Sequence, residues 1–387
     1  MKKFYLLFFL LSGLIFQAEA QDPNFSQFFF KEAYYNPAFT GINPGLKAVL
    51  TNRQFWTNIP GNYMSTHLMV EFYDVKFLNG AFGLNVLSAT KGESFLMSNQ
   101  VGLQYAKRIG LSRDVVCQLG LSGAYGTQNV QYKNLEFPDQ LDPRLGNIFQ
   151  TEFVAPAGKN KPYLDLGAGA VCRFNIMQTS TKPIATNNVG ISFFHINQPD
   201  NGYLPNSQSK LPLKVNIQWY SVIRVNRNSF YNSYYLLAPG FLYENQKLAK
   251  NFFKTDETGF KTLSFGMNGV IPSRLSFMSQ LYTGIWVRKQ FAKSVDIKDA
   301  ISTVTNKNFD ALIFMLGIIK YSRDGKQNWR VCYSYDMTIS NATMATGGTH
   351  EITLAVEIHD LALPKSKSKW GYVHHPSDRF FNLGTGR

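Results

Sequence analysis

Hydrophobic and polar residues alternate with a period of two along most of this chain, in segments of about ten residues. In one segment Leu164, Leu166 and Ala168 share a face, while Asp165 and Gly167 lie on the opposite one. This segment continues to residue 174, and similar segments are found at 46–56, 63–74, 79–88, 98–108, 115–125, 187–196, 213–220, 233–243, 261–270, 280–291, 309–320, 329–336 and 351–358. The pattern predicts an all-β protein with about fourteen strands, an even number that suits a transmembrane antiparallel β-barrel of the bacterial outer membrane.

Three features favour a membrane barrel over a soluble β-sandwich or propeller, whose strands would alternate too. Small or polar residues occupy one face even of central strands, where a soluble core would need apolar filling. Aromatic residues cluster near predicted strand ends, as in Phe55-Trp56 and Tyr234-Tyr235. Long extracellular loops and short periplasmic turns are typical of such barrels, although 175–186 is long for a turn. The long gaps include 57–62, 126–162, 197–211, 244–260, 292–308 and 337–348, and the tight ones are 75–78, 109–114, 226–232 and 321–327.

The first 20 residues have the order of a secretory signal peptide. Lys2-Lys3 is followed by an apolar run from Phe4 to Phe16 and then by the small residues of Ala18-Glu19-Ala20. The run is too short for a transmembrane anchor, so we expect cleavage before Gln21 and export from the cytoplasm. The predicted organisation is a signal peptide at 1–20, an N-terminal aromatic segment at 21–44, an outer-membrane β-barrel at 45–360 and a periplasmic C-terminal tail at 361–387.

Charge and cysteine content narrow the chemistry. The net charge is +14, but the basic residues are scattered and a secreted protein rarely meets nucleic acid, so we predict no nucleic-acid partner. We expect these residues to bind anionic lipid head groups or to line a wet lumen. Cys117, Cys172 and Cys332 are too few and too far apart for a disulfide framework or a zinc site, and we interpret them as small apolar filler. His374-His375 has no accompanying carboxylate cluster, so we predict no metal and no cofactor.

The segment before the first strand is rich in aromatic residues, including Phe28, Phe29 and Phe30. It would not stay dissolved alone, so we expect it to fold into the barrel mouth or to pack against the periplasmic rim, with a loose terminus as the alternative. The strand at 309–320 is apolar on both faces and is expected to pack against a plug or a partner. With an even strand count, the tail at 361–387 is expected on the same side as the N-terminus, either docked on a periplasmic partner or solvated.

Short motifs stand at both ends of the predicted mature chain, in a fixed order. They are Asp22-Pro23-Asn24-Phe25-Ser26-Gln27, Asn36-Pro37-Ala38-Phe39-Thr40-Gly41, Arg53-Gln54-Phe55-Trp56, Pro60-Gly61, Tyr333-Ser334-Tyr335-Asp336 and Gly348-Thr349-His350-Glu351-Ile352. Together these motifs resemble those of the PorP/SprF family of the Bacteroidota type IX secretion system, and the resemblance spans nearly the whole mature chain. Phe55 departs from the family pattern, which usually has Gln next to Trp. The motif residues that we single out are Asp22, Pro23, Phe25, Ser26, Gln27, Asn36, Pro37, Gly41, Arg53, Trp56, Pro60, Gly61, Tyr335, Asp336, His350 and Glu351.

The resemblance implies a membrane component of type IX secretion and gliding motility. Its expected partners are outer-membrane lipid, a large secreted adhesin or its C-terminal domain, and periplasmic components of the secretion apparatus. The chain would help to export the adhesin, hold its C-terminal domain at the cell surface, or contact the periplasmic ring. The long loops would offer the extracellular docking surface, and the N-terminal segment and tail the periplasmic one.

The motifs also have physical interpretations. Pro37 and Gly41 are expected to turn the chain into the first strand. We expect Arg53 and His350 to face the lumen, where a plug could satisfy them. Because the predicted inner face carries both signs of charge, a lumen filled by paired charges is favoured over an open pore, with simple solvation of each charge as the alternative. The charged candidates for the inner face are Arg53, Glu71, Asp165, Arg173, Lys214, Arg330, Asp336, Glu351 and Glu357.

Two other functional classes compete with a secretion role. A passive porin or small-molecule uptake barrel would conduct ions in planar bilayers. An outer-membrane enzyme would need a nucleophile beside a base, but no His has an evident Ser or Cys partner by spacing. The sequence also lacks GxSxG, HExxH and phosphate-loop motifs, so we predict no catalytic residues and no enzymatic activity.

Overall fold

The computed structural model describes residues 22–359 with several gaps. The gaps are 60, 62, 76–79, 93–95, 113–114, 133–134, 143, 155–161, 180–181, 203–208, 229–232, 248–258, 274, 292–308 and 340–345. The predictions for the signal peptide, for Pro60, for the tail at 361–387 and for most of the loops at 244–260 and 292–308 lie outside the described residues. No helix within the described ranges is both long and apolar enough to span a membrane.

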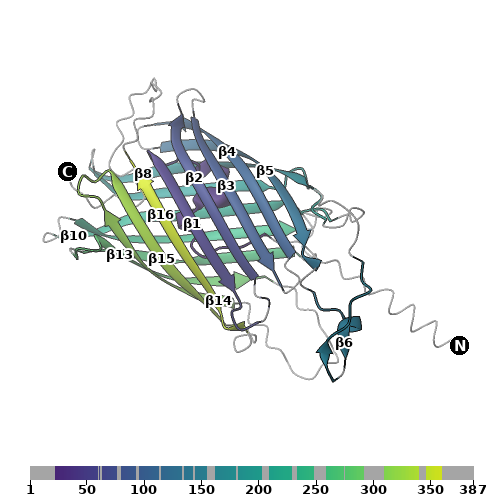
Figure 1. The fold of residues 1–387 in the computed structure, drawn as a ribbon. Coiled ribbons are helices and arrows are strands. Elements are labelled where there is room, and N and C mark those ends of the chain that lie inside the picture. The colour runs from purple at the N-terminus through teal and green to yellow at the C-terminus, as the bar shows by residue number, and fades with distance from the viewer. Residues whose placement is uncertain are drawn as a thin grey trace.

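In the described part of the chain, fourteen antiparallel strands form one closed barrel (Figure 1). They are β1 (Leu46–Phe55), β2 (Tyr63–Val75), β3 (Gly80–Lys91), β4 (Leu96–Gly110), β5 (Val115–Val130), β8 (Tyr163–Thr179), β9 (Lys182–Phe194), β10 (Lys214–Asn228), β11 (Ser233–Lys247), β12 (Gly259–Pro272), β13 (Gln280–Gln290), β14 (Phe309–Tyr321), β15 (Gln327–Thr338) and β16 (Thr349–Ile358). A separate small sheet, β6 (Leu141–Asp142) and β7 (Gly146–Asn147), lies between β5 and β8. The predicted fold class and the predicted number of barrel strands are confirmed.

Each barrel strand pairs with its neighbours in sequence order, and β1 closes the barrel on β16. The closing register runs without a shift from the pair Leu46 and Ile358 to the pair Phe55 and Thr349. Arg53 therefore lies directly opposite Glu351. Closure thus explains why motifs from the two ends of the sequence become neighbours.

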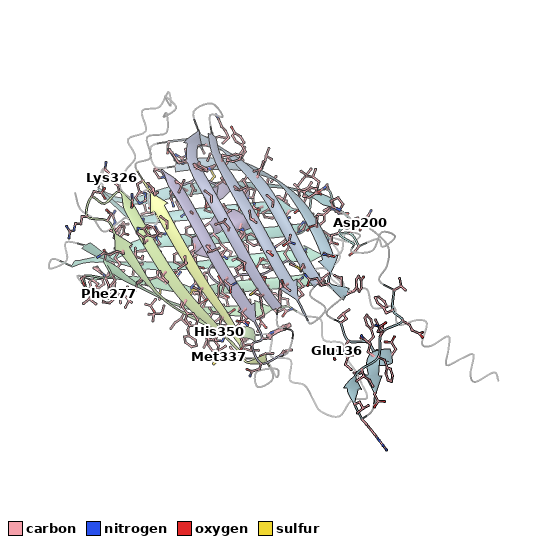
Figure 2. All side chains as sticks on the ribbon, viewed as in Figure 1. Glu136, Asp200, Phe277, Lys326, Met337 and His350 are labelled. Atoms are coloured by element: carbon pink, nitrogen blue, oxygen red, sulfur yellow. A yellow bond between two sulfur atoms is a disulfide. The ribbon has the colours of Figure 1, made fainter. Side chains whose placement is uncertain are left out.

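The alternation of burial along the strands follows the predicted faces. On β15, Trp329, Val331 and Tyr333 are exposed on the outside, whereas Arg330 and Ser334 are buried on the inside. All nine charged residues predicted to face inward are buried. The outer surface is studded with apolar side chains, as a lipid-facing surface requires (Figure 2).

Some local predictions need correction. His350 does not face the lumen, because its neighbour Glu351 does; His350 lies on the outer face and its ring nitrogen is 2.7 Å from the exposed Tyr333 hydroxyl. The gap at 175–186 is not a long turn, since β8 and β9 extend into it and leave only 180–181 between them. The long gap at 126–162 is likewise shorter, because β5 continues to Val130.

The interpretation of all three cysteines as apolar filler is wrong for two of them. Cys117 on β5 and Cys172 on β8 are directly opposed and form a disulfide. They are 55 residues apart in sequence, but the intervening chain loops out and returns as the adjacent strand. Separation along the sequence therefore gave no measure of their distance in the barrel. Cys332 is free and buried on the inner face, as filler would be.

The two ends of the barrel differ in their connections. We call the end with the β1–β2, β5–β8, β9–β10 and β15–β16 connections the long-loop mouth, and the end with tight connections such as 322–326 the short-turn mouth. Ile358 ends the last strand at the short-turn mouth, and His195 follows β9 at the long-loop mouth.

Residues 22–44 run through the inside of the barrel, and we call them the plug. Asp22 contacts His195 at the long-loop mouth, whereas Gly45 leads into β1 at the short-turn mouth. The plug is therefore not confined to a rim. The expectation that the N-terminal end and the end of the last strand share a side is also wrong for Asp22, because strand parity fixes where β1 begins but not where the preceding chain goes.

Candidate functional site in the barrel lumen

The plug contains three short helical turns: η1 (Phe28–Phe30), α2 (Glu32–Tyr35) and η2 (Pro37–Phe39). The Asn36 side chain caps η2 by accepting a hydrogen bond from the Ala38 N–H at 2.9 Å. Pro37 suits the first position of this turn because its missing N–H needs no partner there. Turns of this length are not stable alone in water, so the barrel walls must hold the plug in shape.

One wall of the lumen holds the plug through buried charges. Arg53 of β1 bonds Asp336 of β15 at 2.6 Å and Glu351 of β16 at 2.7 Å. Arg288 of β13 approaches the same Asp336 carboxylate at 3.0 Å. The Ser26 hydroxyl of the plug accepts a hydrogen bond from Arg53 and donates one to Asp336, both at 2.6 Å. We call Arg53, Asp336, Glu351 and Arg288 the charged wall.

The same wall fixes the position of the plug backbone. The Glu351 carboxylate accepts hydrogen bonds from the backbone N–H groups of Ser26, at 2.7 Å, and of Gln27, at 3.2 Å. The Gln27 amide also donates to the Ser334 hydroxyl and to the Glu351 carbonyl, each at 3.1 Å. Because these bonds are directional, a shift of the plug by one residue would leave buried charges without partners.

The adjoining part of the wall, on β13 and β14, holds the plug through apolar contact. The Phe28 ring lies edge-on to Trp286 of β13, with ring centroids 5.1 Å apart. Phe29 stacks on Trp286 and also contacts Tyr282, both at 5.7 Å, and Phe30 contacts Tyr282 at 5.4 Å. The inner face of β14 joins the same buried cluster, which explains why that strand is apolar on both faces. We call Tyr282, Trp286 and the inner face of β14 the apolar wall.

A third part of the wall is made of glycine. The Asn36 amide donates to carbonyl oxygens of β8 and β9, at 3.1 Å each. A Cβ atom on Gly169 would lie 2.1 Å from the Asn36 side-chain oxygen, and one on Gly120 would lie 2.2 Å from the Ala38 nitrogen. The small inward residues of these strands therefore make room for the Asn36-Pro37-Ala38 turn. The sequence pattern favours a filled lumen but does not assign this role to the inward glycines.

At the short-turn mouth a second group of charges holds the base of the plug. Lys47 of β1 bonds Glu32 of the plug at 2.6 Å and lies 3.5 Å from Glu71 of β2. Glu71 accepts the Gly41 N–H at 2.9 Å. Gly41 has a φ of +54°, and a Cβ there would lie 2.6 Å from Ala81, so both backbone conformation and space require glycine.

At the long-loop mouth the plug begins in a third ionic group. The Asp22 carboxylate lies 3.0 Å from His195 and 3.4 Å from Lys214. His195 also lies 3.0 Å from Asp165, and Lys214 lies 3.1 Å from Glu244. Burial alone would lower the pKa of His195, but the Asp22 and Asp165 carboxylates raise it to about 10. His195 is therefore a cation at neutral pH and ties the first described residue to the wall.

The other motif residues of the plug support its internal shape. The Pro23 carbonyl accepts a hydrogen bond from the Tyr34 hydroxyl at 2.8 Å. The Tyr35 hydroxyl is 2.8 Å from the Phe25 nitrogen and 2.9 Å from the Phe25 oxygen. The plug is thus folded back on itself.

The motif residues outside the plug fall into two groups. Arg53, Asp336 and Glu351 meet at the plug, as described above. Trp56 and Tyr335 lie at the long-loop rim instead. Trp56 has a left-handed backbone with φ of 52°, and its N–H donates to the Gly348 carbonyl at 2.9 Å. The Tyr335 ring lies beside His350 on the outer face, with centroids 5.1 Å apart, and Gly61 lies in the first loop with φ of +65°.

Several residues of the site were missed from sequence. Glu32, Lys47, Arg288, Trp286 and His195 were not singled out, although each is buried against the plug or its walls. A charged residue on the inner face of a strand was the available signal for Lys47 and Arg288. Nothing in the sequence pattern placed His195 beside Asp22, because that contact depends on the path of the plug.

The described residues contain no cluster of three or more His, Cys, Asp or Glu side chains that could hold a metal ion. Some of their buried charges pair within the wall, as Arg53 does with Asp336, and others join plug to wall, as Glu32 does with Lys47. The arrangement can hold a segment in place.

Solved barrels share the general architecture at low similarity. A FadL homologue from Pseudomonas aeruginosa is 12% identical with a TM-score of 0.42, covering 85% of this chain and 94% of that one. The CymD monoaromatic hydrocarbon channel is 10% identical with a TM-score of 0.42, covering 87% and 95%. CdiB from Acinetobacter baumannii is 8% identical with a TM-score of 0.41, and while the match covers 81% of this chain it covers only 60% of CdiB.

Sequence comparison identifies the family. No curated protein matches the chain. Residues 17–356 match the family described as type IX secretion system membrane protein PorP/SprF. This match covers most of the chain, and it includes the plug and every barrel strand up to the last. The chain therefore belongs to the PorP/SprF family of type IX secretion system membrane proteins and is a β-barrel of the bacterial outer membrane.

Proposed function

We propose that this chain is a non-enzymatic component of type IX secretion and gliding that exports or anchors a large secreted adhesin, through the adhesin's C-terminal domain, or contacts the periplasmic ring. The observation that carries this proposal is the plug. It crosses the lumen and is bonded to the walls at both mouths, which suits a docking and anchoring barrel better than a passive channel. The long-loop mouth then faces the cell exterior, and the short-turn mouth faces the periplasm.

Each side has a surface that supports one part of the proposal. On the extracellular side, the plug begins at Asp22, which contacts His195 and Lys214 at the long-loop mouth. On the periplasmic side, the short-turn mouth carries basic turn residues such as Arg323 and Lys326, both exposed. A secreted adhesin would bind at the long-loop mouth, and periplasmic ring components would bind at the short-turn mouth.

Crosslinked pull-down of the full chain from outer membranes tests the proposal. Recovery of a large surface protein supports anchoring, and recovery of periplasmic ring lipoproteins alone supports the apparatus role. The alternative, a passive porin, predicts that neither is recovered and that the purified full chain conducts ions in planar bilayers. That pair of results would overturn the proposal.

A further inference from the structure

The connection between β5 and β8 carries a small folded lobe beyond the barrel wall, at the long-loop mouth (Figure 1). We call the described residues 135–142 and 144–154 the acidic lobe. Its turn at Pro138–Gln140 precedes the β6–β7 hairpin, and the Phe137 and Phe153 rings stack with centroids 4.4 Å apart. Figure 2 shows the side chains of this lobe, with Glu136 labelled, apart from the barrel strands.

The acidic lobe lies outside the barrel, and its own side chains hold it in a definite shape. The Asp139 carboxylate accepts hydrogen bonds from the Thr151 hydroxyl, at 2.9 Å, and from the Glu152 N–H, at 2.7 Å. The Asp142 carboxylate accepts the N–H groups of Arg144 and Leu145, at 2.8 and 2.9 Å. These bonds preorganise the lobe, which lowers the entropy cost of binding a partner.

The lobe leaves large apolar side chains exposed to water. Val154 is 85% exposed and Leu145 is 71% exposed. The others, between 40% and 52% exposed, are Leu141, Ile148, Phe149 and Phe153. Six exposed large apolar side chains on one small structured element indicate an interaction site, since soluble surfaces rarely keep so many uncovered together.

The charge of the lobe selects the kind of partner. Its described residues include Glu136, Asp139, Asp142 and Glu152 but only one basic residue, Arg144. The whole chain, in contrast, has a net charge of +14. Hydrogen bonds from the backbone of Glu152 and from Thr151 lower the pKa of Asp139, so that it stays ionised. An excess of carboxylates on the lobe repels the phosphates of an anionic lipid surface and attracts Lys and Arg.

We propose that the acidic lobe is a docking surface for a secreted protein whose apolar patch is bordered by Lys and Arg. This inference rests on the proposed function, because it names the surface by which that barrel receives its extracellular partner. Apolar burial supplies the affinity, and the acidic residues of the lobe set orientation and the rate of encounter.

Photo-crosslinking in intact cells tests the inference. A photoreactive amino acid replaces Leu145 or Phe149 in the full chain, with Ile196, 49% exposed at the same mouth but outside the lobe, as the matched control position. We expect adducts of one secreted protein at both lobe positions. Mass spectrometry should place the crosslink in a partner peptide that is apolar and flanked by Lys or Arg.

Charge reversal supplies the decisive variant. Glu136→Lys with Glu152→Lys should lower adduct yield about tenfold, equivalent to about 1.4 kcal/mol, while Glu136→Gln with Glu152→Gln should lower it less. Both variants spare Asp139 and Asp142, which shape the lobe, and heat-modifiable migration on gels confirms that the barrel has folded.

The remaining outcomes separate two failures. Three results would each overturn the lobe proposal. They are adducts with lipid alone, a crosslinked partner peptide that is acidic, and an adduct yield that charge reversal leaves unchanged. A secreted protein captured from Ile196 but not from the lobe would do so while leaving the proposed function intact. If no position captures a protein, and cells lacking the chain still display their secreted adhesins, both proposals fail.

Discussion

The charged wall and the apolar wall bind neighbouring residues of the same plug through different interactions. Ser26 and Gln27 meet Arg53, Asp336 and Glu351 through short directional bonds. The next three residues, Phe28–Phe30, meet aromatic rings and aliphatic side chains. The stabilisation from apolar contact grows with the buried area and changes little when the two surfaces shift slightly. A buried ion pair, in contrast, loses much of its stabilisation when its partners are displaced. The apolar wall therefore supplies attraction, and the charged wall supplies register.

Removing the whole plug should have the largest effect, because both walls lose the segment that they bind. Deletion of residues 22–40 with the signal peptide retained leaves both walls without a partner, so water should enter the lumen. We expect ion conductance in planar bilayers from the deletion variant and little or none from the full chain. Deletion of the acidic lobe, residues 135–154, is the control and should not open the pore. Equal conductance of the full chain and the plug deletion would show that the plug does not close the lumen.

Removing one partner of the charged wall should come next. Among the described residues, Arg53→Ala leaves Asp336 with only Arg288, at 3.0 Å, and Glu351 with only Lys31, at 3.8 Å, as cationic neighbours. Breaking such a buried network costs about 3–5 kcal/mol. The temperature at which the barrel unfolds, followed by heat-modifiable gel migration, should fall accordingly. Combining Arg53→Met with Arg288→Met, Asp336→Leu and Glu351→Met removes all four charges of the charged wall and should recover much of the loss. A quadruple variant less stable than the single one would contradict this account of the wall.

The apolar wall should respond in proportion to size. Phe29→Ala removes a buried ring that contacts Trp286 and Tyr282, at a cost of about 3–4 kcal/mol. Phe29→Leu keeps most of the volume and should cost less than about 1.5 kcal/mol. The same gel assay reports both. A loss as large for leucine as for alanine would mean that ring geometry, and not apolar volume, holds this part of the plug.

The difference between the walls also explains what the sequence could predict. Alternation placed Arg53, Asp336 and Glu351 on the inner face, because side chains of a strand point alternately to its two sides. It could not say that Gly169 and Gly120 make room for a plug turn, since an inward glycine is compatible with water as well as with protein. It also could not pair Cys117 with Cys172, or Asp22 with His195, because those contacts depend on how connections and plug are routed through space.

The mouth contact between Asp22 and His195 should depend on pH. The folded pKa of His195, about 10, lies above its ordinary value of about 6.5, so its contribution is complete below pH ~6.5 and is lost as pH rises through 10. Between those limits the loss is at most about 1.4 kcal/mol per pH unit. Unfolding temperatures of the full chain and of His195→Gln, measured from pH 6 to 10.5, should therefore converge as pH rises. A difference that stays constant would show that His195 acts only by packing.

The smallest effect should come from the glycine part of the wall, where neither charge nor apolar area is at issue. Gly169→Ala places a methyl group 2.1 Å from the Asn36 oxygen, so the plug turn must shift, at a cost of about 1–2 kcal/mol. Gly123→Ala is the matched control on the neighbouring strand, since its methyl would meet only Leu166, at an ordinary 3.9 Å. A shifted turn should also loosen Ser26 and Gln27, so hydrogen exchange of the plug should rise in Gly169→Ala and not in Gly123→Ala. Exchange that rises equally in both would mean that the strands, and not the seat of the Asn36 turn, set the mobility of the plug. The two walls would then hold residues 26–30 independently of the turn beneath them.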